Sequence, residues 1–161
     1  MQNFKDNTVF SFIDKNEERF KVNLPYKIER HNGKDIALID VRTSDRVSNY
    51  VLYAGAVSQT KLDSSDINDL SRILLSKKYF KISDSEQQDF IRLHEIGHIS
   101  LKHKTPRKLE NEIAADEYSI SITKNHKAAL TFLGNALKEV RLDETKNELI
   151  ARINAITTRR L

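Results

Sequence analysis

Three neighbouring residues, His94, Glu95 and His98, have the types and spacing of a metal site with an adjacent base. They form the pattern H-E-x-x-H, in which two imidazoles bind a zinc ion and the glutamate accepts a proton. Positions i and i+4 lie on one face of a helix, so both rings can reach the same ion. Glu95 lies about 100 degrees further round the helix, where it can contact a water without being a ligand. The pattern therefore predicts two ligands and a separate general base.

The residues around this pattern indicate a buried helix over about 84–104. Ser83 and Glu86 have the S-x-x-E spacing of a capping box. Apolar residues follow on most of the helix surface: Phe90, Ile91, Leu93, Ile96, Ile99 and Leu101. Gly97 costs roughly 1 kcal/mol relative to alanine inside a helix, so we expect another backbone or a ligand to come close there. Pro106 is predicted to end the helix.

A third protein ligand is needed, because a catalytic zinc site normally has three and keeps one position open. His103 follows His98 by five residues and lies well round a regular helix from it, so we do not expect His103 to bind the same ion. Glu112 is the favoured candidate. The chain after His98 is long enough to turn at Thr105-Pro106 and return antiparallel with Glu112 facing the ion.

Two further acidic residues lie near Glu112. Glu110 is an alternative ligand, but it points elsewhere if Glu112 points inward. Asp116 lies one helical turn beyond Glu112 and can accept the other ring N–H of a ligating histidine, which fixes the tautomer of that ring. The sequence therefore predicts a site with two histidines, one glutamate and a carboxylate behind them.

With Glu112 and Asp116 included, the pattern resembles that of the gluzincin metallopeptidases. The stretch 90–103, F-I-R-L-H-E-I-G-H-I-S-L-K-H, and the segment 112–118 resemble the small soluble ImmA/IrrE-like group more specifically, although Asp116 stands where that group usually has Asn. The resemblance covers about 87–122. It implies a minimal zincin-like fold and limited proteolysis of a specific intracellular protein, such as a transcriptional repressor.

The expected reaction is hydrolysis of a peptide bond by a zinc-dependent endopeptidase. Zn²⁺ is the predicted cofactor, since its charge lowers the pKa of water toward ~7 and polarises a carbonyl. Glu95 is the predicted general base and passes the water's proton to the leaving amine. Tyr118 and His126 are candidates for an additional oxyanion donor. A protein or peptide substrate can add as a strand to the edge of the N-terminal sheet.

Two other classes of protein remain open. One is a catalytically silent zincin-fold regulatory module that keeps the metal for stability or sensing. The other is a protein-binding component of a phage or mobile element. Glu95 favours the enzyme, because a degenerate enzyme commonly loses its base.

Length and composition limit the fold. The chain has 161 residues and 39% hydrophobic content, enough for one core. We predict a single domain, 1–161, of class α+β, in which a small N-terminal β-sheet packs on a helical bundle that contains the HExxH helix. Residues 1–60 are expected to be mainly strands and residues 61–161 mainly helices.

Hydrophobic patterning predicts the individual elements. The N-terminal part predicts an antiparallel or mixed sheet of about three to five strands, with Asn32-Gly33 as a hairpin turn. The predicted strands are 9–13, 20–22, 26–29, 36–41 and 50–57, and the predicted loops are 16–19 and 43–48. Besides the metal helix, the predicted helices are 62–79, 107–123, 126–140 and 143–157.

Several classes of protein are excluded or disfavoured. The absence of cysteine excludes disulfides and a thiolate zinc site. No apolar run reaches the ~18 residues that cross a bilayer, and residues 1–8 are too polar for a signal peptide, so we expect a soluble, cytoplasmic monomer with no membrane partner. The net charge of +4 includes basic residues near 102–108 and 159–160. They lack interleaved aromatic residues, so we expect an ordinary solvated surface and no nucleic-acid partner.

Overall fold

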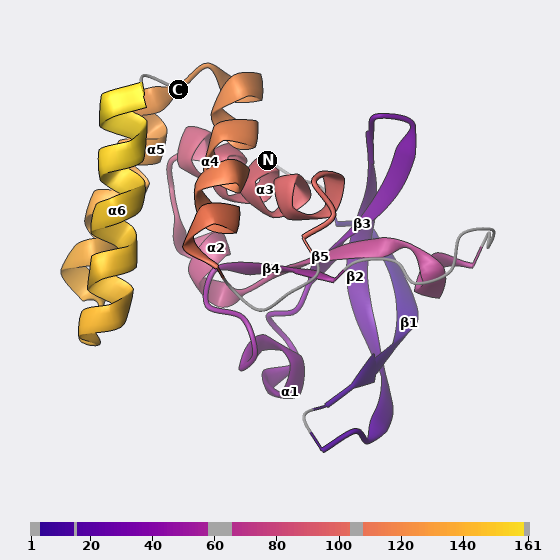
Figure 1. Cartoon of the computed structure of the whole chain (residues 1–161). Coiled ribbons are helices and arrows are strands. Elements are labelled where there is room, and N and C mark those ends of the chain that lie inside the picture. The colour runs from indigo at the N-terminus through magenta and orange to yellow at the C-terminus, as the bar shows by residue number, and fades with distance from the viewer. Residues whose placement is uncertain (1–3, 15, 58–65, 104–107, 160–161) are drawn as a thin grey trace. The chain divides into compact units, whose positions relative to one another are not determined.

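The computed structural model describes residues 4–14, 16–57, 66–103 and 108–159 (Figure 1). The chain forms two compact units, a strand-rich unit up to Lys81 and a helical unit from Ile82. Strands followed by helices confirm the α+β class. The single domain stays a prediction. The predicted turn at Thr105-Pro106 and the basic residues Lys104, Arg107 and Arg160 lie outside the described residues.

The strand-rich unit holds one mixed sheet in the order β1-β2-β3-β5-β4 among the residues described. Strands β1, β2 and β3 are antiparallel neighbours, β5 runs parallel to β3, and β4 is antiparallel to β5. The bounds are Asp6–Ile13 for β1, Arg19–His31 for β2, Lys34–Asp40 for β3, Ala54–Val57 for β4 and Ser71–Leu75 for β5. The predicted sheet size is confirmed, and of the two sheet types that the sequence left open, the sheet is mixed.

The predicted hairpin turn is also confirmed. Asn32 and Gly33 have φ angles of 50° and 77°, and positive φ at both central residues is the geometry that Asn-Gly favours between antiparallel strands. Strand β2 is one continuous element where the sequence predicted two. Pro25 lacks an N–H donor but stands just before the pairing with β3 begins at Tyr26, so it removes no hydrogen bond from that pairing.

The predicted helix over 62–79 is wrong in its described part. Residues Ile67–Asp69 form a 3₁₀ turn, Ser71–Leu75 form β5, and only Lys77–Lys81 are helical, as α2; the predicted helix start at 62–65 lies outside the described residues. All five residues of β5 are buried. A parallel strand covered on both faces has a continuous apolar run, and periodicity alone does not separate such a run from a buried helix.

Two smaller corrections concern the segment between β3 and β4. The predicted loop 43–48 contains a short helix, α1 (Asp45–Ser48), which begins where the Ser44 side chain accepts a hydrogen bond from the Val47 N–H. The strand predicted over 50–57 is shorter, because β4 includes only Ala54–Val57. Ser44 is a favourable N-cap residue, and this local preference outweighs the loop-like composition of the segment.

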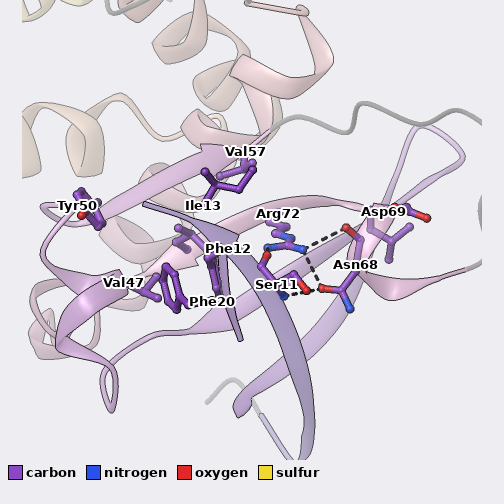
Figure 2. Close-up of a pocket in the computed structure, with 12 residues that line it drawn as sticks. Ser11, Phe12, Ile13, Phe20, Val47, Tyr50, Val57, Asn68, Asp69 and Arg72 are labelled. Carbon is purple, nitrogen blue, oxygen red and sulfur yellow. Dashed lines mark hydrogen bonds between the residues drawn. The ribbon is translucent and has the colours of Figure 1, made fainter. Parts of the chain in front are cut away.

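A cavity of about 420 Å³ lies in the strand-rich unit, and Figure 2 shows its lining. Its polar end is built by the 3₁₀ turn and β5 against the outer edge of β1. Arg72 Nη1 donates to the Ser11 carbonyl at 2.8 Å, and Asn68 Oδ1 accepts from the Ser11 N–H at 2.8 Å. Asn68 Nδ2 also donates to the Val9 carbonyl at 3.2 Å. Side chains therefore occupy three of the backbone groups, at Val9 and Ser11, through which this edge could pair with another strand.

Replacing Asn68 by Ala is expected to destabilise the protein by about 1 kcal/mol, because hydrogen bonds to two backbone groups of β1 are lost at a partly exposed site. Asn49→Ala, at an exposed position after α1, is the matched control and should change stability by less than about 0.5 kcal/mol. The midpoint of urea unfolding measures both variants. Equal midpoints for the two would contradict a supporting role for Asn68.

The helical unit contains the four predicted C-terminal helices. Their bounds are Ser85–Ser100 for α3, Leu109–Thr123 for α4, His126–Glu139 for α5 and Asp143–Arg159 for α6. Helix α4 packs along α3, and α6 packs against α4 and α5 (Figure 1). No helix within the described ranges is long and apolar enough to cross a membrane.

Candidate metal centre

Helix α3, which carries the H-E-x-x-H pattern, begins at Ser85. Asp84 is its N-cap, and its carboxylate accepts the Glu86 N–H at 2.9 Å. The predicted capping box from Ser83 is therefore wrong, although Glu86 does lie in the first turn. Aspartate caps as well as serine does, and its charge also interacts favourably with the positive end of the helix dipole.

The helix ends at Ser100, earlier than the predicted Lys104, so Pro106 is not what ends it. Lys102 has a left-handed φ of 57°, and the His103 N–H donates to the His98 carbonyl at 3.0 Å. This is the Schellman arrangement, in which the chain reverses and satisfies the last carbonyl groups of the helix. The turn thereby brings the side chain of His103 back beside His98.

Helices α3 and α4 pack closely against each other. A Cβ placed on Gly97 would lie 3.1 Å from the Cβ of Tyr118, so the predicted close approach is real but is made by a side chain. Ser119 Oγ, one residue on, donates to the Phe90 carbonyl at 2.8 Å, and Ala115 is fully buried in the same interface. These contacts place Glu112 and Asp116 opposite the two histidines.

The three predicted ligands come together. His94 Nε2 and His98 Nε2 are 3.1 Å apart, and the Glu112 carboxylate lies 3.3 Å from His94 Nε2 and 3.0 Å from His98 Nε2. His94 and Glu112 are buried and His98 is partly buried. Two imidazoles and a carboxylate that converge in this way can hold a metal ion.

The spacing of the donor atoms fits a small tetrahedral ion. Ligand distances of about 2.0–2.1 Å place neighbouring ligand atoms about 3.3 Å apart at the corners of a tetrahedron. The two Nε2 atoms are 3.1 Å apart, close to this value, while Glu112 approaches them with different oxygens, Oε2 at 3.3 Å from His94 Nε2 and Oε1 at 3.0 Å from His98 Nε2. The three described donors could hold such an ion at three of its corners.

Glu95 lies beside this group without belonging to it. Its Oε2 is 3.8 Å from His94 Nε2, and its side chain is 14% exposed. Burial raises the pKa of Glu95, against the opposing effect of the two histidines. A carboxylate with a raised pKa, next to the ring nitrogens that face the ion site, has the position and basicity of a proton acceptor.

Asp116 holds His94 from behind, as predicted. The His94 Nδ1–H donates to Asp116 Oδ1 at 2.8 Å, so Nε2 is the nitrogen that faces the other ligands. Asp116 is fully buried and accepts two further hydrogen bonds from Arg152, at 2.9 Å from Nε and 2.8 Å from Nη2. Arg152 Nη1 is also 3.6 Å from Glu112 Oε2.

The sequence did not predict that Arg152 belongs to this group of side chains. Arg152 lies on α6 between Leu149 and Ile156, and all three side chains are buried. Their spacing places them on one helix face, so a charged residue interrupts an apolar stripe. Such an arginine is a signal for a buried carboxylate partner. The sequence does not say which carboxylate that is.

The ionisable side chains of the site change one another's pKa values. Burial alone would raise the pKa of Glu112 and of Asp116, but hydrogen bonds from His94 and the charge of Arg152 outweigh it and lower both pKa values. Burial would lower the pKa of His94, but the hydrogen bond and charge of Asp116, helped by Glu112, raise it to about 9. Both carboxylates are therefore ionised at neutral pH, whereas His94 holds a proton there that a bound cation would have to displace.

The remaining candidates lie elsewhere in the helical unit. Glu110 is exposed in the first turn of α4 while Glu112 is buried, in line with the preference for Glu112. Tyr118 packs its ring over Gly97 and its hydroxyl accepts from Ser100 Oγ at 3.3 Å. His126 begins α5, and its Nε2 is buried without a hydrogen-bond partner among the described residues. The oxyanion role of Tyr118 and His126 stays a prediction.

Comparisons of the chain with protein-family models, curated proteins and solved structures found no match. The likeness to gluzincins therefore rests on the motifs around His94 and Glu112 alone.

Proposed function

We propose that this protein is a zinc-dependent endopeptidase that performs limited proteolysis of a specific protein substrate. The observation that carries the proposal is the convergence of His94 Nε2, His98 Nε2 and the Glu112 carboxylate, with Glu95 beside them. A ligand group and an adjacent base are the two parts that metal-assisted hydrolysis needs. The gluzincin-like spacing of these residues supports the same reaction class.

Zinc is the proposed ion because of the chemistry of the donors. Two imidazole nitrogens and one carboxylate suit Zn²⁺, whereas Mg²⁺ and Ca²⁺ prefer oxygen ligands throughout. The 3.1 Å between the two histidine Nε2 atoms also suits two corners of a tetrahedral ion. Within the described part of the chain the group has three protein donors, and a catalytic zinc site normally has that number.

Each residue has a distinct task in the proposed reaction. A bound zinc ion supplies Lewis acidity, which lowers the pKa of water and polarises the scissile carbonyl. Glu95 accepts the proton of the attacking water and delivers it to the leaving amine. Asp116 keeps the proton of His94 on Nδ1, so that Nε2 presents a lone pair, and Arg152 keeps Asp116 in place.

The test combines metal analysis of the purified protein with a cleavage screen against host proteins, in which new N-termini are identified by mass spectrometry. Wild-type protein is expected to contain close to one equivalent of zinc and to cleave a small set of substrates. Glu95→Gln should retain the zinc and lose about 10²-fold or more of the cleavage rate, because an amide does not accept the proton. Glu144→Gln, at an exposed position in the first turn of α6, is the matched control and should cleave normally.

The outcomes of this screen separate the classes of function. Unchanged cleavage by Glu95→Gln would refute the general-base role. Zinc without cleavage in the wild-type protein would favour the silent regulatory module. Wild-type protein that takes up no zinc would remove the basis of the proposal.

The proposed oxyanion donors, Tyr118 and His126, can be assigned once a substrate is known. Tyr118→Phe and His126→Phe each remove a polar hydrogen while keeping a ring. If one of the two residues is the oxyanion donor, its variant is expected to lose about 10²–10³-fold in kcat with its zinc content unchanged. Normal kcat in both variants would mean that neither residue has this role.

A further inference from the structure

The two histidine ligands are each held on the side away from the ion site, but by different groups. His94 Nδ1 meets the carboxylate of Asp116 at 2.8 Å. His98 Nδ1 meets Nδ1 of His103 at 2.7 Å, and the two ring centroids are 5.0 Å apart at an interplanar angle of 67°. In both ligands Nε2 is left to face the other donors. His103 therefore has the same relation to His98 that Asp116 has to His94.

We propose that His103 is a positioning residue that accepts the Nδ1–H of His98 and thereby presents the Nε2 lone pair of His98 to the metal ion. This inference rests on the proposed zinc site. A contact of 2.7 Å between two ring nitrogens needs one donor and one acceptor. Because His98 must keep the lone pair on Nε2 to bind a cation, its proton is on Nδ1, and His103 is the acceptor.

The end of α3 explains why His103 is in this position. On a regular helix a residue five positions after His98 would lie about 140 degrees away round the axis. The left-handed residue Lys102 reverses the chain instead, and the His103 N–H bonds to the His98 carbonyl at 3.0 Å. In a Schellman turn these two positions commonly have side chains in contact. Here that contact is a hydrogen bond between two imidazoles.

His103 is not a fourth ligand in this geometry. Among the described residues, the group whose donor atoms converge consists of His94, His98 and Glu112. The His103 nitrogen that makes the contact lies on the Nδ1 side of the His98 ring, while the other ligands lie on its Nε2 side. The expectation that His103 does not bind the ion is thus retained, and its proposed role is to accept the Nδ1–H of His98.

Three variants of the full chain test the proposal by zinc affinity, measured in competition with a chromophoric chelator. His103→Leu removes the acceptor and should weaken zinc binding about 10–100-fold. His103→Phe keeps a ring but no acceptor, so it should show the same loss and replaces the leucine variant if that one does not fold. His103→Asn can place an amide oxygen where Nδ1 was, and should keep affinity within about threefold of wild type.

Two readouts distinguish positioning from general support of the fold. The melting temperature of the metal-free protein should be similar in all three variants, because the ring of His103 is only partly buried. The visible absorption spectrum of the Co²⁺-loaded protein should change in the leucine and phenylalanine variants and be restored by asparagine. A structural role would lower the metal-free melting temperature without this rescue.

Unchanged zinc affinity in the leucine or phenylalanine variant would overturn the proposal, and so would an asparagine variant as weak as leucine. These failures concern His103 alone as long as the wild-type protein binds zinc and cleaves its substrate. A wild-type protein that binds no zinc would instead remove the proposed function together with this inference.

Discussion

The Glu112→Gln variant is expected to lose stoichiometric zinc and all detectable cleavage. Among the described residues, Glu112 contributes the carboxylate of the converging group, and its oxygens lie 3.3 Å and 3.0 Å from the two ring nitrogens. A neutral amide is a far weaker ligand and no longer balances the positive charge of the ion. The loss of zinc affinity should exceed the ~10–100-fold that is typical when only an outer partner of a ligand is changed.

The thermal stability of the protein provides a second measure of the same loss. A ligand present at 100 times its dissociation constant stabilises a folded protein by about 2.7 kcal/mol. For a chain of this size, that corresponds to a rise in Tm of about 5–10 °C. Wild-type protein should show this rise on addition of zinc and lose it in EDTA, whereas Glu112→Gln should melt at the same temperature in both.

Glu110→Gln is the matched control, because it makes the same chemical change on the same helix at an exposed position. It should bind zinc, respond to EDTA and cleave as the wild-type protein does. If Glu110→Gln lost the metal and Glu112→Gln kept it, the assignment of the third ligand would be reversed. If neither variant lost the metal, a carboxylate outside the described group would have to be the ligand.

The convergence of the candidate ligands could be predicted from the sequence because their geometry is largely local. His94 and His98 are one turn apart on a single helix, so their relative position follows from helix geometry alone. Glu112 required one additional assumption, that α4 returns along α3, and the contact of Tyr118 with Gly97 shows how closely the two helices pack. The position of His103 could not be predicted, because it depends on the left-handed conformation of Lys102, a residue type that rarely adopts it.

The errors in the fold arise where tertiary contacts decide the structure. Ser71–Leu75 is a strand because β3 and β4 lie on either side of it, and neither neighbour can be recognised from the residues of β5 themselves. Arg152 was missed for a related reason. Its partners on α4 are distant in sequence, and only the packing of α6 brings them together.

Arg152→Met is expected to destabilise the metal-free protein by about 3–5 kcal/mol, because it removes the guanidinium that donates two hydrogen bonds to the fully buried Asp116. Methionine has a similar length and no charge, so the loss of packing is small. Unfolding by urea in EDTA measures the effect. Arg141→Met, at an exposed position before α6, is the matched control and should stay within about 0.5 kcal/mol of wild type.

A double-mutant cycle with Asp116→Asn separates the ion pair from the effect of the arginine alone. The two side chains share two hydrogen bonds, so the double variant should be more stable than the sum of the single changes predicts, by about 0.5–3 kcal/mol. Additive effects would mean that Arg152 acts on another group, and Glu112, 3.6 Å from Nη1, would then be the first to test.

Zinc should reduce the cost of Arg152→Met, and this dependence links the ion pair to the metal site. In the metal-free protein Arg152 balances the charge of Asp116 and part of that of Glu112. A bound cation neutralises Glu112 itself, so less uncompensated negative charge remains in the variant when zinc is present. The stability difference between Arg152→Met and wild type should therefore be smaller with zinc than in EDTA. An equal difference in both conditions would show that the arginine and the ion act independently, which the shared contact with Glu112 argues against.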